Sequence, residues 1–194
     1  MKQQIGIVLR KDFTKSRTIF LFDKDNGKME CTPTSYDVCL GALVQYQRVT
    51  QRSRLITISE VIALPHDVTH INILFFHHVL EICFHFLPME APAQELFALL
   101  EQLYTRQGLL VTAWHQKLFI AKILLYFGMY PEDSDFPLAY LHRIAYEPID
   151  IMMHRSINLG FEAQLDRWLH GCIMLHPNIE QFKTIHFLDE SRIV

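Results

Sequence analysis

Short apolar runs separated by turn residues fill the first sixty positions, a pattern typical of β-strands. The runs are rich in β-branched and aromatic residues, which favour strands. Between two of them, Asn26-Gly27 predicts a type I′ hairpin turn, because both central residues of that turn need a positive φ. The expected strands cover residues 6–10, 18–22, 28–32, 42–49 and 54–62. Five short strands with no helical period between most of them predict a small closed or nearly closed barrel.

Beyond Pro65, apolar residues recur at three- and four-residue spacing, which indicates helices. The first helix should end before Pro88, and Gly128 is well placed to stop a later one. The buried face of the first helix is expected to hold Ile71, Leu74, Phe75, Val79, Ile82 and Phe86. Further helices are expected over residues 92–103, 113–128, 137–146, 149–154 and 160–172. We therefore predict an α+β protein, with a β-barrel domain at residues 1–64 and an all-α domain at residues 65–194.

Composition and charge narrow the class of protein. The chain of 194 residues is 50% hydrophobic and has four scattered cysteines, which excludes a disordered tail and a disulfide scaffold. Its formal net charge is −3, which excludes a strongly basic coat over the whole chain. Residues 1–60 nevertheless carry ten basic and six acidic side chains, a balance of +4, and the remainder has a balance of −7. This asymmetry favours the first sixty residues as the part that meets phosphate.

The sequence shows no sign of a membrane span or a signal peptide. Met1 to Gln4 lead into a strand-like run, not into an uninterrupted apolar segment. The longest apolar stretch, residues 71–87, is interrupted by charged and histidine side chains and is shorter than the ~20 residues that a span requires. We expect a cytoplasmic protein without a membrane partner.

No enzyme motif is found along the chain. It lacks a Gly-rich nucleotide loop, a nucleophile elbow and a Cys-x-x-Cys pair. His78, Glu81 and His85 would share one helix face and leave a metal enzyme open as an alternative, although zinc peptidase helices use a different spacing. Asp133 and Asp135 are interpreted as solvated charges or a helix cap. We expect a non-enzymatic protein with no catalytic residues, no cofactor and no metal.

Basic residues of the predicted barrel indicate a nucleic-acid interface. They gather in the first loop and around the turn between the last two strands, two loops that can flank one face of a small barrel. The predicted DNA-binding residues are Arg10, Lys11, Lys15, Arg17, Arg48, Arg52 and Arg54. Binding of unpaired bases also requires aromatic platforms, for which the candidates are Phe13, Phe20, Tyr36 and Tyr46. Each of these aromatic residues can equally be part of the core.

Several segments resemble the RecO family of bacterial recombination mediators. Residues 7–10, 18–22 and 27–29 are similar to the first three strands of that family, and residues 41–46 and 55–61 to its later strands. The most specific segment is residues 117–131, which looks like the family's helix end Arg-Phe-x-x-x-Leu-Leu-x-x-Leu-Gly-Tyr-x-Pro. Trp168-Leu169 and Phe182-Lys183-Thr184 loosely match its closing helix. The resemblance implies an N-terminal oligonucleotide-binding (OB) fold barrel followed by an all-α helical domain.

The resemblance also implies a function in DNA repair and recombination. RecO proteins bind and anneal single- and double-stranded DNA and help load recombinase, together with a RecR-type mediator. Their helical domain captures the acidic tail of single-strand-binding protein. Here that role would fall to Lys117, Leu118, Phe119 and Lys122, with the cations meeting the tail's carboxylates. The expected location is the cytoplasm, in association with the nucleoid.

The chain departs from the RecO pattern at three places. Residues 33–40 carry no Lys or Arg where family members have a longer basic loop. No four-cysteine zinc module follows residue 131, and Ile185 stands where the family has its closing Arg. A diverged protein-interaction scaffold with the same fold and little DNA affinity is therefore the alternative function.

Overall fold

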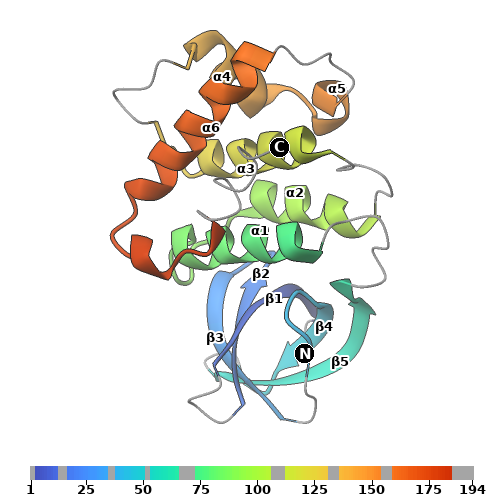
Figure 1. Ribbon diagram of the computed structural model, residues 1–194. Coiled ribbons are helices and arrows are strands. Elements are labelled where there is room, and N and C mark those ends of the chain that lie inside the picture. Colours follow the sequence, from blue (N-terminus) through green and yellow to red (C-terminus); the bar gives the residue numbers. More distant parts are fainter. Residues whose placement is uncertain are drawn as a thin grey trace. The chain divides into compact units, whose positions relative to one another are not determined.

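The computed structural model describes residues 3–12, 17–34, 38–50, 53–65, 73–105, 112–130, 136–153 and 159–184. The chain divides into two compact units, Met1–Gln107 and Gly108–Val194 (Figure 1). The first unit holds the strands and two helices, and the second unit holds the remaining helices. The last strand ends at Ala63, close to residue 64, after which the sequence predicts helices. The boundary between the two compact units lies later in the chain, after Gln107.

Five strands form a closed barrel in the first unit, as the sequence predicts. They are β1 (Gln4–Asp12), β2 (Thr18–Asp23), β3 (Gly27–Pro33), β4 (Leu43–Arg48) and β5 (Leu55–Ala63). Their order around the barrel is β1-β2-β3-β5-β4. β3 and β5 pair in parallel and all other neighbours pair antiparallel. The register of β1 against β2 shifts between Val8 and Arg10, and such an irregularity bends a strand. An OB-like barrel followed by helices is thus the observed fold class.

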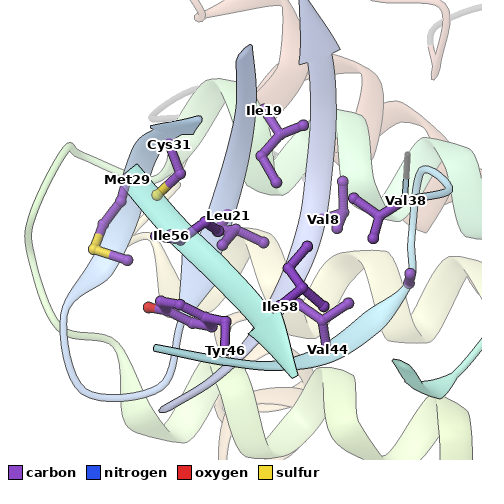
Figure 2. Packing of buried hydrophobic residues seen from close by; sticks show 11 residues of the cluster. Val8, Ile19, Leu21, Met29, Cys31, Val38, Val44, Tyr46, Ile56 and Ile58 are labelled. Atoms are coloured by element: carbon purple, nitrogen blue, oxygen red, sulfur yellow. The ribbon is translucent and has the colours of Figure 1, made fainter. Parts of the chain in front are cut away.

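The barrel interior is filled by side chains from all five strands (Figure 2). Alternate positions point inward because successive side chains of a strand face opposite sides of the sheet. On β5, Ile56 and Ile58 are buried while Leu55 and Thr57 are exposed. Burial raises the pKa of the Cys31 thiol to about 12, so that this cysteine remains protonated as part of the core.

The turn between β2 and β3 differs from the predicted type I′ hairpin. Asp23 pairs with Gly27, which leaves three residues in the loop, and Gly27 has a φ of 78° while Asn26 is not among the positive-φ residues. The reason is the buried Asp23 carboxylate, whose Oδ1 accepts hydrogen bonds from the backbone N–H groups of Asp25 (2.9 Å) and Asn26 (2.6 Å). These bonds hold an Asx turn, and only glycine adopts the positive φ that follows it at low cost.

Two helices, α1 (Ile73–Phe86) and α2 (Gln94–Thr105), pack against the barrel within the first unit (Figure 1). The ring of Phe97 on α2 lies 5.4 Å from that of Phe22 on β2. The linker between the helices approaches β3 so closely that a Cβ on Gly27 would lie 2.0 Å from the carbonyl oxygen of Ala91. Close approach therefore adds a second reason for glycine at this position.

The buried face of α1 differs in part from its predicted stripe. Phe75, Val79 and Ile82 are buried as predicted, but Leu74 is 62% exposed. Ile71 lies outside the described residues, and Phe86 is half-buried. The buried face instead includes Phe76, Leu80 and Cys83. Leu74 shares a helix face with His77, Glu81 and His85, and this polar face of α1 is the one turned away from the core.

The second unit is helical. It comprises α3 (Ala113–Tyr126), α4 (Leu138–Tyr146), α5 (Ile149–Met153), α6 (Leu159–Met174) and a 3-10 turn, η2 (Ile179–Gln181). Helix α3 is capped at its start by the Thr112 hydroxyl, which accepts from the N–H of His115. It ends at Tyr126, and the predicted stop, Gly128, follows two residues later with a φ of 71°. The N–H of Gly128 donates to the carbonyl of Leu125, and the N–H of Met129 donates to that of Leu124.

Candidate nucleic-acid interface

A row of cross-strand neighbours crosses the outer face of the barrel. Arg10 on β1 lies opposite Phe20 on β2, and Phe20 lies opposite Glu30 on β3. The two flanking residues of β2, Ile19 and Leu21, belong to the interior cluster, so Phe20 points outward. Directly opposed side chains share a face, which places Arg10 and Glu30 on the outside as well. This surface, which we call the outer row, consists of Arg10, Phe20, Glu30 and, through an ion pair, Arg54.

The ion pair that extends the outer row is exposed. Nη1 of Arg54 lies 2.9 Å from Oε2 of Glu30, and the side chains are 73% and 22% exposed. Arg54 stands just before β5, whose first residues pair with the end of β3, and this pairing brings the two side chains together. The backbone bond from the N–H of Thr32 to the carbonyl of Arg54, 2.8 Å long, fixes the strand ends.

Helix α1 contributes an aromatic ring beside the outer row. The rings of Phe84 and Phe20 pack edge to face, with their centroids 5.1 Å apart. The guanidinium carbon of Arg10 lies 4.7 Å from the centroid of the Phe84 ring. Lys28 on β3 donates from Nζ to the Phe84 carbonyl over 2.6 Å, and burial lowers the pKa of this lysine. Neither Phe84 nor Lys28 was a candidate in the sequence, since Phe84 stands outside the apolar stripe predicted for this helix.

Lys11 and Arg48 belong to the inward-facing side of their strands. Lys11 is opposite Ile19 and Arg48 is opposite Ile56, both of which are core residues. Lys11 and Arg48 are half-buried, and Arg48 donates from Nη2 to the sulfur of Met29 in the interior cluster. The structure therefore separates these two cations from Arg10 and Arg54, which the barrel presents on its outer face.

The remaining predicted barrel residues fall into two groups. Arg17 is exposed directly before β2, with a φ of 66°. Lys15 and Arg52, and the aromatic candidates Phe13 and Tyr36, lie outside the described residues.

Tyr46 is a core residue and not a surface platform. It is fully buried, and its hydroxyl donates to Oδ2 of Asp23 over 2.6 Å. Burial and the adjacent carboxylate raise the pKa of the Tyr46 phenol above its ordinary range. Its position on β4 explains this, because Tyr46 alternates with outward residues and shares the inward face with Val44. Phe20 is thus the described aromatic candidate that lies on the outer face.

The four residues predicted for partner binding lie on α3, where their side chains serve the second unit itself. Lys117 is 1% exposed, and its Nζ lies 3.1 Å from Glu162 Oε1 and 2.9 Å from Asp166 Oδ1 on α6. Leu118 and Phe119 are buried. Binding of an acidic tail by these residues stays a prediction.

Lys122 caps the C-terminal end of α4. Its Nζ donates to the backbone carbonyl oxygens of Ile144, Ala145 and Glu147 over 2.9, 2.8 and 2.8 Å. These carbonyls stand at the end of α4, where no further turn of helix supplies donors. Partial burial lowers the pKa of the Lys122 ammonium group.

In the described part of the chain, the histidine residues that suggested a metal enzyme do not form a metal site. His78, Glu81 and His85 lie on α1 and are half-buried. Within those residues, no group of three or more His, Cys, Asp or Glu side chains is placed to hold a metal ion. Asp133 and Asp135 lie outside the described residues. Among the helices described, none has the length and apolar character needed to cross a membrane.

In comparisons with known proteins, no protein-family model matches the chain and no curated protein matches it.

Proposed function

We propose that the protein is a non-enzymatic DNA-binding protein of RecO type that acts in DNA repair and recombination. The outer row carries this proposal, because it combines two exposed guanidinium groups with the half-buried ring of Phe20 on one face of an OB-like barrel. Closed barrels of this kind bind oligonucleotides on the face that includes β2 and β3. Guanidinium groups bind phosphate oxygens, and aromatic rings stack with unpaired bases.

The partner part of the proposal rests on the RecO resemblance alone. Single-strand-binding protein and a RecR-type mediator are its expected partners, and the nucleoid its expected location. Lys117 already pairs with two carboxylates of its own unit, so a tail carboxylate would have to displace one of them. The diverged scaffold remains the second candidate function, favoured by the small net charge of the barrel segment.

Salt-dependent binding of a labelled oligonucleotide tests the proposal. The single strand should exceed the ~4–16 nucleotides that one OB fold covers, and fluorescence anisotropy should be measured at several salt concentrations. We expect affinity to fall as salt rises, with a slope that decreases by about 0.7 when Arg54→Gln removes one phosphate contact. Arg143→Gln, which removes an exposed arginine paired with Glu147 in the second unit, is the matched control. Absence of binding at low salt, or affinity that ignores salt, would favour the scaffold.

A further inference from the structure

Glu30 places a negative charge inside the surface assigned to nucleic acid. It lies opposite Phe20, the aromatic residue of the outer row, and it holds the guanidinium of Arg54 at 2.9 Å. A carboxylate at this point repels a phosphate and occupies the donors that would bind one. Its presence therefore works against the function that the rest of the outer row supports.

The exposure and geometry of the Arg54–Glu30 pair allow a phosphate to replace the Glu30 carboxylate at low cost. Arg54 is 73% exposed, and pairs with such exposure are screened by water and salt and contribute little to stability. The planar guanidinium presents a fork of N–H donors that fits carboxylate and phosphate oxygens alike. A phosphate that approaches the outer row can replace Glu30 as the acceptor while the strand pairing that positions Arg54 stays intact.

We propose that Glu30 is a built-in competitor of the nucleic-acid backbone: it holds Arg54 in the free protein and thereby keeps the affinity for single-stranded DNA below the value that the outer row would otherwise give. The inference rests on the proposed function and deepens it, because it assigns regulation of affinity to one residue of that same surface. The ligand group that competes with Glu30 for Arg54 is the phosphodiester.

Three variants and a matched control test this competition. Glu30→Gln keeps the size of the side chain and removes its charge, Arg54→Gln removes the cation, and the double variant removes both. Glu147→Gln is the control, because Glu147 also pairs with an arginine, Arg143, at 3.1 Å and with comparable exposure (25%), but in the second unit. All are titrated with the labelled single strand over a range of salt, and far-UV circular dichroism confirms that each is folded. Glu30→Thr, which has high strand propensity, replaces Glu30→Gln if that variant fails to fold.

The expected result is non-additive. Glu30→Gln should raise affinity at low salt about three- to tenfold, and its salt slope should stay close to that of the wild type, because Arg54 contacts phosphate in the bound state of both proteins. Arg54→Gln should cost more affinity in the Glu30→Gln background than in the wild-type protein, because Glu30 no longer competes for Arg54. Glu147→Gln should bind as the wild type does.

Three outcomes would overturn the inference. The first is that Glu30→Gln binds DNA with the affinity of the wild type. The second is that Glu147→Gln gains as much affinity as Glu30→Gln, which would show a general charge effect. The third is that Glu30→Gln gains as much affinity in the Arg54→Gln background as in the wild-type protein. If the wild type binds with a clear salt slope and Glu30→Gln does not differ in affinity, the proposed function stands and the competition falls. If neither protein binds at low salt, both fall. Binding gained only by Glu30→Gln supports the competition.

Discussion

The cations of the outer row and those of α3 occupy opposite environments. Arg10 and Arg54 are exposed; Arg10 lies over an aromatic ring, and Arg54 pairs with a half-buried carboxylate. Lys117 is buried between two carboxylates, and Lys122 donates to three backbone carbonyls. Basic side chains can therefore be matched to ligands only after their own contacts within the protein are known. The barrel arginines can change partners at low cost, whereas the α3 lysines are tied to the stability of their unit.

The largest expected effect comes from Lys117→Met. Removal of the ammonium leaves Glu162 and Asp166 without their cation at a site where Asp166 is buried, and such a loss costs about 3–5 kcal/mol of unfolding free energy. Urea unfolding followed by tryptophan fluorescence measures it, because the chain's two tryptophans, Trp114 and Trp168, both lie in the second unit.

A triple variant provides the control for Lys117→Met. If Glu162→Gln and Asp166→Asn are added, no charge remains in the site, and much of the lost stability should return. A Lys117→Met protein that unfolds at the same urea concentration as the wild type would show that this lysine is not a structural cation, and the contrast with the outer row would lose its main support.

Lys122→Met should have a smaller effect on the same unit. Methionine fills a similar volume but donates no hydrogen bond, so the carbonyls at the end of α4 lose their shared donor. We expect a loss of about 1–3 kcal/mol in the same urea experiment. Arg143→Met, which alters an exposed arginine of α4, should change stability by less. Equal losses in the two variants would contradict the capping role of Lys122.

Alkaline pH should weaken the barrel through Tyr46. Burial raises the pKa of its phenol above the ordinary value of about 10, so the native state keeps this proton after the unfolded state has lost it. The stability present below pH ~10 therefore falls as pH rises, by up to about 1.4 kcal/mol per pH unit for one group. Tyr46→Phe should show a shallower decline in unfolding experiments followed by far-UV circular dichroism. Identical slopes for the two proteins would contradict the assignment.

The smallest effect on stability is expected from Arg54→Gln. An exposed ion pair contributes about 0–1 kcal/mol, so the variant should unfold close to the wild type. Its loss should appear in DNA binding instead, while Lys117→Met, studied below its unfolding transition, should keep DNA binding. Thermal melting and anisotropy on the same samples separate the two kinds of loss. A large loss of stability in Arg54→Gln would place this arginine with the α3 lysines.

Local patterns were enough to predict the elements of the fold. The strands and helices follow from periodicity, because alternation and three-to-four spacing each report one buried face. The stop at Gly128 followed for a similar reason, since a C-terminal glycine needs only its own φ. The turn after Asp23 was missed because its type depends on a carboxylate buried by β4, which is distant in sequence.

The residues of the outer row could be predicted only in part, because strand register decides which side chains face outward. Arg10 and Arg54 were candidates, but so were Lys11 and Arg48, which differ from them by facing the interior side of their strands. A shift of one residue moves a side chain to the opposite face, and the irregularity between Val8 and Arg10 sets that register on β1. Phe84 joins the surface through tertiary packing of α1, for which the sequence contains no local signal.

The salt dependence of single-stranded DNA binding decides whether the outer row contacts nucleic acid. The variant with both Arg10→Gln and Arg54→Gln should be compared with Arg143→Gln over a range of salt. We predict that the outer-row variant binds more weakly and that its salt slope is shallower by about 1.4, the value for two phosphate contacts, while the control matches the wild type. Equal affinities and equal slopes for all three proteins would contradict the assignment of the outer row to nucleic acid.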